Sequence, residues 1–528
     1  MNRAASLAAV ALGAVVTALS FPSTDAGFLA WFGLVPLLLA VRGRSVREAF
    51  GLGWLFGLVL YLIVLYWISP TISNFTRITP MLAHLVLLLL VAVVGLFTAG
   101  FAAVVEWIAG AGISRVIAAP LVWVVIEYSR SYIPAAFPWA LLGYSQSGVE
   151  PVIQIADIGG VYLVSAILVF INAVLAEVAT DGPRRHGLLL AASAAMLVVV
   201  LGYGSLRAAS VADQIGSEPA ASLRVGLVQG NIRQDRKWDR SFEAEILETH
   251  LSLTRRAIDD GAGLIVWPEA AVPFPLRLDP RAAQLIDLSR ASGVRLLVGA
   301  PGIEVLGPRS YRQYNRAWLI DPEAGLAGSY DKIQLVPFGE YVPFGWLLWW
   351  VDQAVQAIGN FGRGSEYVVF EVPADAGAGG DVAIGVSSLI CYEGIFPALT
   401  RNFVAAGARL LVNISNDAWY GRTSAPHQHL AMAAVRAVEN RVPVVRATNT
   451  GVSAFVDAVG RIRGRTPLFE EAVAVDDVVI ADTFSLYRAL GDWFVYLCMI
   501  AVAALAALRM RLGPVLIRER ERGILPSR

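Results

Sequence analysis

Three side chains that could carry out chemistry at a carbonyl group follow short apolar runs of the sequence. Glu269 comes after the run 263–267, and Cys391, one of only two cysteines, comes after the run 383–390. Lys332 lies between them and is one of only two lysines among 42 basic residues. A carboxylate can act as a general base, a thiolate can attack a carbonyl carbon, and a compact ammonium can stabilise the resulting oxyanion. These residue types in this order predict an active site with a cysteine nucleophile.

Each of the three residues would have a defined role. Glu269 would take the thiol proton and later return it to a leaving group, while Lys332 would stabilise the tetrahedral oxyanion. If Cys391 lies between a strand and a helix, the positive end of that helix should lower the pKa of the thiol. Taken singly, Cys391 could be a buried structural cysteine, Glu269 a loop glutamate and Lys332 a surface lysine. Their combination favours one shared active site.

The composition indicates a membrane protein. Of the 528 residues 56% are hydrophobic, and the mean hydropathy is +0.60, too apolar for a soluble protein of this size. The formal net charge is zero and no basic stripe occurs, so nucleic acid is not an expected partner. Two cysteines cannot make a disulfide framework, and we interpret His427 and His429 as structural or substrate-pocket residues. We therefore expect neither a metal nor an organic cofactor.

Apolar stretches of about 20 residues, enough to cross a bilayer, fill the N-terminal part of the chain. We expect spans at residues 4–21, 27–41, 50–69, 82–108, 116–133, 158–178 and 187–204, and an eighth at 489–509. Arginines gather in the short connections on one side, which indicates the cytoplasmic side. They are Arg42, Arg44, Arg47, Arg115, Arg184, Arg185, Arg509, Arg511, Arg518, Arg520 and Arg522. Both termini should then be cytoplasmic, with the region between the last two spans outside.

Between those two spans the pattern changes to short apolar runs alternating with amphipathic segments. Expected strands are 223–228, 264–266, 295–298, 317–320, 382–390, 410–414, 444–447 and 453–456, and expected helices are 241–259, 281–292, 396–406 and 426–440. This alternation indicates an α/β domain with its own core. We divide the chain into a membrane domain (1–208), a catalytic domain (209–486), and a last span with a tail (487–528).

Longer motifs around the candidate residues resemble those of the nitrilase superfamily. With the membrane spans, they narrow the resemblance to the apolipoprotein N-acyltransferase family over nearly the whole chain. The motifs are Gln229-Gly230-Asn231-Ile232, Lys237-Trp238, Trp267-Pro268-Glu269, Leu335-Val336-Pro337-Phe338-Gly339-Glu340, Cys391-Tyr392-Glu393, Asn413-Ile414-Ser415-Asn416-Asp417-Ala418-Trp419-Tyr420-Gly421 and Arg446-Ala447-Thr448-Asn449-Thr450-Gly451.

The resemblance implies an α-β-β-α sandwich attached to eight membrane spans. It implies that Cys391 takes an acyl chain from a phospholipid as a thioester. The N-terminal amine of a diacylglyceryl-modified cysteine in an apolipoprotein would then receive the chain. It also implies a monomer in the bacterial inner membrane, with the catalytic domain in the periplasm. Glu340, Glu393, Tyr392 and Trp238 match supporting residues of the family.

Several aromatic residues are candidates for lipid contact. Trp346, Trp349 and Trp350 follow the Lys332 loop, and exposed tryptophans favour the membrane interface. We expect this segment to dip into the outer leaflet and gate lipid access, although packing inside the domain fits the sequence equally well. Further candidate substrate- or lipid-binding residues are Asn416, Trp419, Tyr420, Trp139 and Arg130. Arg130 could hold a lipid phosphate, or could pair with Glu127 one helical turn away.

Two other functions fit parts of the pattern. A membrane-bound nitrilase-like amidase would use the same three residues with water as the acceptor, but would not need eight spans. A transporter or scaffold with an inactive nitrilase-like domain predicts damaged catalytic positions, whereas Glu269, Lys332 and Cys391 are all present. The sequence therefore favours the acyltransferase.

Overall fold

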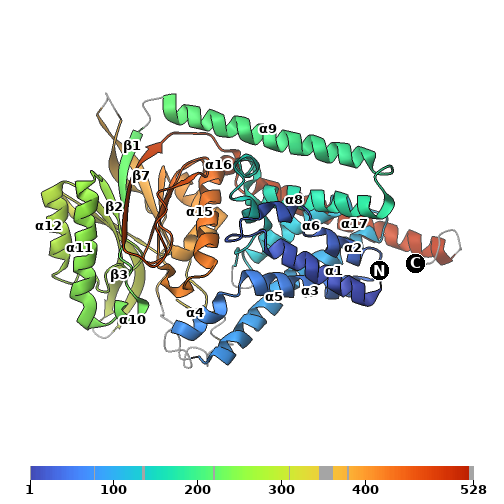
Figure 1. Cartoon of the computed structure of the whole chain (residues 1–528), viewed down its shortest axis with the longest axis horizontal. Helices are drawn as coiled ribbons and strands as arrows, with labels where there is room; N and C mark the ends of the chain where they lie inside the picture. Colours follow the sequence, from blue (N-terminus) through green and yellow to red (C-terminus); the bar gives the residue numbers. More distant parts are fainter. Residues whose placement is uncertain are drawn as a thin grey trace. The chain divides into compact units, whose positions relative to one another are not determined.

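The structure is a computed structural model. It describes residues 2–75, 78–133, 137–217, 221–307, 310–343, 346, 361–376 and 380–521. The chain divides into two compact units (Figure 1). The helical unit comprises Met1–Ser69, Thr79–Leu206 and Leu490–Arg528, and the α/β unit comprises Pro70–Ile78 and Arg207–Ala489.

Five helices of the described residues are long and apolar enough to cross a membrane. They lie in α3 (Val46–Val64), α5 (Pro80–Ala109), α8 (Ala156–Asp181), α9 (Gly187–Ser217) and α17 (Trp493–Glu521). The other three expected spans coincide with shorter elements: α1 (Arg3–Ala18), η1 (Gly27–Trp31) with α2 (Val35–Val41), and α6 (Arg115–Arg130). A 16-residue helix rises only about 24 Å, less than the ~30 Å of a bilayer core. The apolar helices among the described residues are thus of unequal length, and five of them are long enough to cross a membrane.

Glu127 and Arg130, the two polar residues considered as a pair, are buried inside the helical unit. Glu127 accepts a hydrogen bond from the Leu142 N–H at 2.6 Å, and Arg130 donates to the Ala140 carbonyl at 3.1 Å. The Arg130 guanidinium also lies 5.1 Å from the Tyr61 ring centre, and only 2% of the residue is exposed. The 140–142 backbone therefore covers the Arg130 side chain.

The α/β unit is built on twelve strands in which two half-sheets share one edge contact. The strand order is β11-β10-β9-β8-β7-β6-β1-β2-β3-β4-β5, with β12 beside β1. The halves meet through the single pair Ser222 and Asp375 of β1 and β6. The strands are β1 (Ala221–Gln229), β2 (Leu264–Val266), β3 (Arg295–Gly307), β4 (Ser310–Asp321), β5 (Gly325–Asp331), β6 (Phe370–Asp375), β7 (Asp381–Ile390), β8 (Leu410–Ser415), β9 (Val444–Thr448), β10 (Ala454–Val456), β11 (Ile462–Arg463) and β12 (Ala472–Ile480).

The two half-sheets enclose a common apolar core. Leu264 and Val266 of β2 face this core together with Val386 of β7, whereas Ile265 faces the opposite side with Leu251 of α11. Because side chains alternate across a strand, each half-sheet can bury both faces. The result is an α-β-β-α layering, as the nitrilase resemblance implied.

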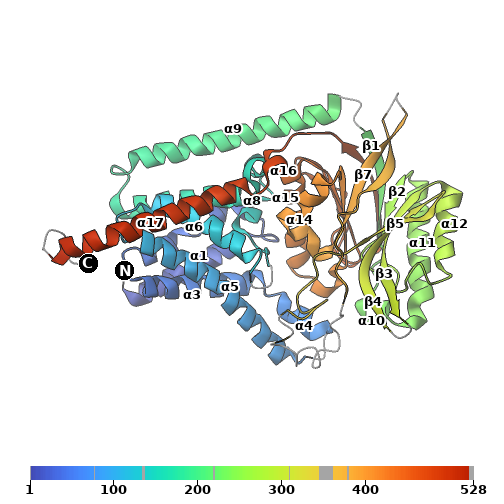
Figure 2. The ribbon, with the colours of Figure 1, turned by 180° about the vertical axis from the view of Figure 1, so that it is seen from behind.

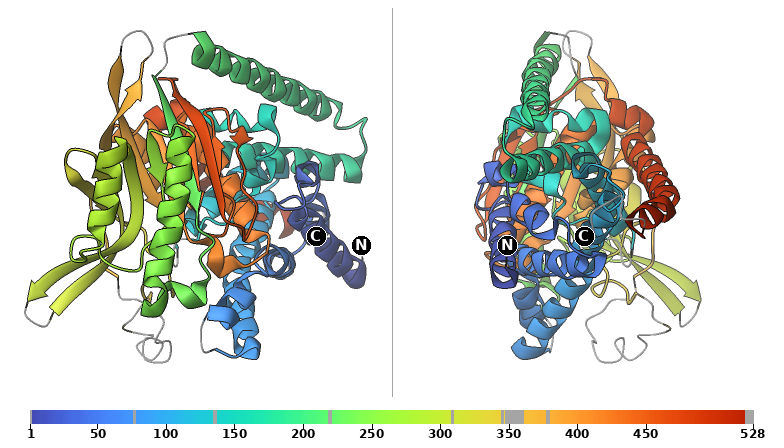
Figure 3. Two further views of the ribbon diagram at one scale, coloured as in Figure 1. Left: turned by 60° about the vertical axis from the view of Figure 1, so that its left-hand side comes forward. Right: turned by 90° about the vertical axis from the view of Figure 1, so that its right-hand side faces the viewer.

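Four helices form the outer layers of the α/β unit. α11 (Glu243–Asp259) packs on β1 and β12, and α12 (Ala282–Ser292) packs on β4 and β5 (Figure 1). On the other half, α15 (Ala425–Asn440) packs on β9 and β10, with α14 (Pro397–Ala405) beside it (Figure 2). The β3–β4 hairpin extends from the edge of the sheet (Figure 3).

Candidate active site

The candidate residues follow the ends of strands from both half-sheets. Glu269 follows β2, Lys332 follows β5, and Cys391 follows β7. β1, β2 and β3 run parallel to one another, as do β7, β8 and β9. Parallel strands deliver the residues that follow them to the same edge of a sheet, which brings these loops together.

Lys332 is buried between two carboxylates. Its Nζ donates to Glu340 Oε1 at 2.9 Å and lies 3.5 Å from Glu269 Oε1. The Nδ2 of Asn315 in β4 donates to the same two oxygens, at 3.0 and 2.6 Å respectively. Burial would lower the pKa of Lys332, but Glu340 and Glu269 raise it well above its ordinary value. Lys332 is therefore a fixed cation.

Glu269 is held at both its side chain and its main chain. Its Oε2 accepts a hydrogen bond from the Asn416 N–H at 2.9 Å, and its carbonyl oxygen accepts one from Lys237 Nζ at 2.9 Å. Burial acts to raise the pKa of Glu269, but Lys332, the Asn315 amide, Lys237 and the Asn416 N–H together hold it below its ordinary value. Glu269 is therefore ionised and able to accept a proton.

Cys391 lies at a sharp turn after β7. Its backbone has φ +53°, in the left-handed region that non-glycine residues rarely adopt, and it begins a short 3₁₀ turn, Cys391–Ile395. Burial, and then the charge of Glu269, raise the pKa of the thiol to about 12, with Lys332 opposing them. The expected lowering of this pKa was wrong, because the segment after Cys391 is one 3₁₀ turn rather than a helix with a substantial dipole.

Glu393 ties the nucleophile turn to the Lys332 loop. Its Oε1 accepts hydrogen bonds from the Ile333 N–H at 2.7 Å, the Gln334 N–H at 3.0 Å and the Tyr330 hydroxyl at 2.7 Å. Its Oε2 accepts from the Ile390 N–H at 2.7 Å. One carboxylate thus fixes the backbone on both sides of the site.

A second buried network fixes the Cys391 carbonyl. Asn413 Nδ2 donates to that oxygen at 3.3 Å, and His429 Nε2 lies 3.2 Å from it. On its other side, His429 Nδ1 lies 3.0 Å from Arg446 Nη2, which also donates to Asp417 at 2.7 Å. This network assigns the proton of a neutral His429 to Nε2, with Nδ1 accepting from Arg446.

The remaining candidate residues fall into two groups. Asn416 and Tyr420 are close to the three central residues: Asn416 through its N–H to Glu269, and Tyr420 through its ring, 6.4 Å from the His429 ring. Tyr392 is buried and packs edge-on against Phe396 at 5.1 Å.

The aromatic residues proposed to contact lipid are more dispersed. Trp238 is half-exposed and Trp346 is 81% exposed, while Trp419 is also solvent-accessible. Trp349 and Trp350 lie outside the described residues. In the helical unit, Trp139 is buried against Trp67, with ring centres 4.9 Å apart.

Sequence reasoning gave no role to several residues that the structure brings to the site. Asn315 bridges Glu269 and Glu340, and Lys237 holds the Glu269 carbonyl. The rarity of lysine could have indicated Lys237, since it is the only lysine besides Lys332. No feature of the sequence indicated Asn315, because neither its residue type nor its neighbours set it apart from other asparagines.

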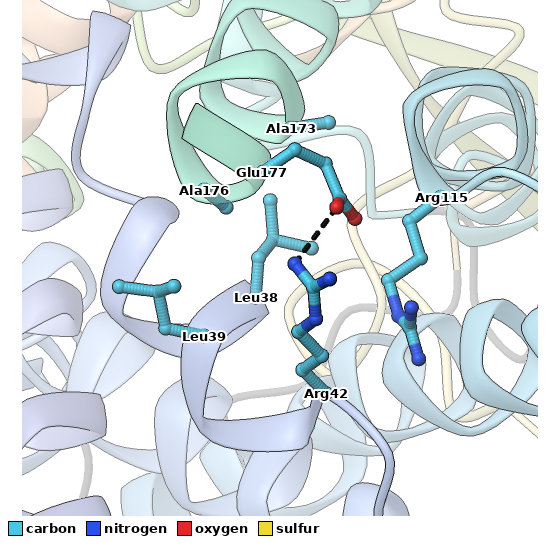
Figure 4. Close-up of a pocket in the computed structure, with 7 residues that line it drawn as sticks. All are labelled: Leu38, Leu39, Arg42, Arg115, Ala173, Ala176 and Glu177. Atoms are coloured by element: carbon cyan, nitrogen blue, oxygen red, sulfur yellow. Dashed lines mark hydrogen bonds and ion pairs between the residues drawn. The ribbon is translucent and has the colours of Figure 1, made fainter. Parts of the chain in front are cut away.

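A small pocket in the helical unit holds a separate charged cluster (Figure 4). Arg42 donates to Glu177 at 2.7 Å and to Asp181 at 3.0 Å, and Arg115 donates to Glu106 at 2.5 Å. In the part of the chain that the structure describes, Glu177, Asp181 and His186 form the one group spaced closely enough to hold a metal. Arg42 already occupies both carboxylates, so we assign this cluster a structural role.

Comparisons with known proteins cover almost the whole chain. Residues 13–174 match the family model of the apolipoprotein N-acyltransferase N-terminal domain, and residues 224–487 match that of the carbon-nitrogen hydrolases. An apolipoprotein N-acyltransferase of Geobacter metallireducens is 42% identical over 507 residues, covering 95% of this chain and 94% of that protein. One of Agrobacterium fabrum is 33% identical over 540 residues, covering 96% of each.

Among solved structures, a mutant of the amidase from Nesterenkonia sp. AN1 is 23% identical, with a TM-score of 0.36. It covers 49% of this chain and 91% of that chain. The relatives matched over the full length, together with both family models, decide the assignment. The chain is an enzyme of the apolipoprotein N-acyltransferase family.

Proposed function

We propose that the protein transfers an acyl chain from a membrane phospholipid, through a thioester on Cys391, to the N-terminal amine of a diacylglyceryl-modified cysteine in an apolipoprotein. The observation that carries this proposal is the buried Lys332 ammonium between Glu340 and Glu269, 2.9 and 3.5 Å from their Oε1 atoms, in the same α/β unit as the buried Cys391 thiol that follows β7. The same chain carries apolar helices able to cross a membrane, which suits lipid substrates.

In the first half-reaction, Glu269 removes the Cys391 proton as the sulfur attacks the ester carbonyl of the donor. The carbonyl oxygen becomes an oxyanion, and the Lys332 ammonium stabilises it. When the tetrahedral intermediate collapses, the ester C–O bond breaks and Glu269 returns its proton to the departing alkoxide. The products are an acyl-thioester on Cys391 and a lysophospholipid.

In the second half-reaction, the acceptor amine attacks the thioester carbonyl. Glu269 takes a proton from the attacking nitrogen, and Lys332 again stabilises the oxyanion. The C–S bond breaks, an amide forms, and the Cys391 sulfur recovers the proton from Glu269. The enzyme returns to its starting state with no cofactor consumed.

Neighbouring residues support these steps. Glu340 orients the Lys332 ammonium, and Glu393 holds the nucleophile turn at a fixed distance from the Lys332 loop. Tyr392 and Tyr420 line the space that receives the acyl chain, and Asn416 holds the base. Trp238 and Trp419 are accessible for contact with the lipid substrate.

The membrane arrangement follows from the arginine distribution and the lipid substrates. The chain crosses the bacterial inner membrane eight times with both termini in the cytoplasm, and its α/β unit acts in the periplasm. Trp346 contacts lipid of the outer leaflet, supported by its high exposure. The enzyme acts as a monomer.

Mass spectrometry of the acyl-enzyme tests the function. Purified full-length protein is incubated with a chain-labelled phospholipid and no acceptor, then digested and analysed. We expect the labelled chain on Cys391, released by hydroxylamine and absent from Cys391→Ala. A synthetic diacylglyceryl-cysteine peptide should then discharge the chain onto its amine.

The alternatives give different products. Labelled free fatty acid formed at the same rate with and without the peptide would indicate a hydrolase. An intact donor with no acyl-Cys391 in folded protein would contradict the acyltransferase proposal altogether.

A further inference from the structure

The second lysine of the chain, Lys237, is buried next to the general base. It ends the short helix α10 (Gln234–Lys237), and only 1% of the residue is exposed. Its Nζ donates to the main-chain oxygen of Glu269 at 2.9 Å. Burying an ammonium costs several kcal/mol unless compensating charges lie nearby. Its position therefore requires an electrostatic explanation.

The groups that face Lys237 come from three elements. Burial lowers the pKa of Lys237 to about 8, and the charge of Glu269 opposes this shift by stabilising the ammonium; the nearby Cys391 would do so only as a thiolate. On α11, burial lowers the pKa of His250 to about 4, and its Nδ1 faces the Ile246 carbonyl at 2.8 Å. His250 is thus neutral, and the one anion beside Lys237 is Glu269.

The charge balance of the site shows what Lys237 contributes. Lys332 alone faces two carboxylates, Glu269 and Glu340, so these three groups carry one net negative charge. That charge would lie beside a thiol that must give up its proton. A second buried cation neutralises the excess and favours the ionised form of Glu269.

We propose that Lys237 is a positioning residue of the reaction. Its hydrogen bond fixes the backbone of the general base, and its charge keeps Glu269 ionised while Cys391 is still protonated. In the acyl-transfer reaction this role rests on the proposed function, but its effect on proton transfer from Cys391 does not depend on the substrate.

Alkylation of Cys391 provides a readout independent of the acyl donor. The rate of Cys391 modification by iodoacetamide is measured against pH on the full-length protein, with peptide-level mass spectrometry to separate Cys391 from Cys498. The fall of the alkylation rate on the acid side of this profile, its acid limb, reports protonation of Glu269. Lys237→Met removes the charge at nearly constant length, and Lys237→Arg keeps the charge. Thr254→Val is the neutral control: it removes the 2.8 Å hydrogen bond that Trp267 Nε1 donates two residues before Glu269, and the 2.7 Å bond that Thr254 donates to the His250 carbonyl, without changing any charge.

We expect Lys237→Met to move the acid limb upward by about one pH unit, with alkylation about tenfold slower on the acid side. Lys237→Arg and Thr254→Val should leave the limb where the unmodified protein has it. A Lys237→Met limb at the unmodified position would overturn the proposal, and so would equal shifts in Thr254→Val or Lys237→Arg. If the unmodified protein forms no acyl-Cys391 but the Lys237→Met limb still shifts, the proposed function fails while this inference stands.

Discussion

At the scale of single residues, the resting site holds an ionised general base and a protonated nucleophile. Cys391 rests as a buried thiol with a pKa raised to about 12, whereas the pKa of Glu269 lies below its ordinary value. Thiolates, not thiols, are oxidised and alkylated readily, so a protonated cysteine is protected until a substrate arrives. The proton needs to move only when the carbonyl is in place, and Lys332 then neutralises the charge that develops.

The depressed pKa of Glu269 gives a pH prediction. Glu269 gains a proton, and stops acting as a base, only as the pH falls through a pKa below the ordinary value of about 4.3. Acyl-Cys391 formation should therefore be level from neutral pH down into the ordinary range of glutamate and fall only below that range. Asn315→Leu removes the 2.6 Å hydrogen bond to Glu269 Oε1, so the pKa of Glu269 rises and the acid limb moves up by about one unit.

The measurement is single-turnover acylation across the pH range. Tyr314→Phe is the control on the same strand, since it removes a hydroxyl that bonds Glu304 at 2.8 Å and also interacts with Arg312. An Asn315→Leu limb that coincides with that of Tyr314→Phe would show that the amide does not control the base.

At the scale of elements, the position of Glu269 depends on the close approach of β3 to the turn that carries this residue. A Cβ added at Gly299 of β3 would lie 2.3 Å from the Pro268 carbonyl oxygen and 2.8 Å from the Glu269 Cα. These are backbone atoms that cannot swing away, so the turn itself would have to shift. The Ala271 N–H also donates to the Gly299 carbonyl at 2.7 Å, which couples the turn to the strand.

We predict that Gly299→Ala displaces Glu269 and lowers the acylation rate about 100-fold, the usual effect of a misplacement near 1 Å. Unfolding should become easier by about 1–3 kcal/mol because of the overpacking. Gly307→Ala on the same strand is the matched control, because its added Cβ has open space. Acylation rates and thermal unfolding of both variants check this, and equal rates would contradict it.

The sequence predicted the buried strands well and the others poorly. The run 264–266 was found with correct bounds because it is apolar on both faces. β5 (Gly325–Asp331) lacks β-branched residues, and β6 (Phe370–Asp375) contains Pro373, so neither carries a strand pattern. Both were missed, although β5 delivers Lys332 to the site.

Rare residue types led to the candidate site, and the structure places Lys332 against Glu269 and Glu340; their catalytic roles stay predictions. One cysteine and one lysine stood out by scarcity, and their motifs gave Glu269, Glu340 and Glu393. The sequence could not predict the resting charge of Cys391, because that depends on burial and on the 3₁₀ turn after it. Nor could it indicate that Arg130 is covered by the 140–142 backbone, which depends on tertiary packing.

At the scale of the whole molecule, the lipid substrates require a catalytic unit tethered to the membrane. Free soluble enzyme would have to extract each two-chain lipid from the bilayer, at about 0.8 kcal/mol for every CH₂ group exposed to water. Apolar helices on both sides of the α/β segment in the sequence can tether the catalytic unit to the membrane instead. The arginines in the short connections then decide on which side the site works.

Labelling of single cysteines tests this orientation. In a background of Cys391→Ala and Cys498→Ala, Glu248→Cys places a thiol on the exposed face of α11, where Glu248 is 63% exposed, and Arg185→Cys places one in the 182–186 connection, where Arg185 is 75% exposed. A membrane-impermeant maleimide added to cells with a permeable outer membrane should label Glu248→Cys. It should reach Arg185→Cys only after the inner membrane is disrupted. Because the two side chains are similarly exposed, the inner membrane alone separates the outcomes, and the reverse pattern would place the α/β unit in the cytoplasm and overturn the proposed orientation.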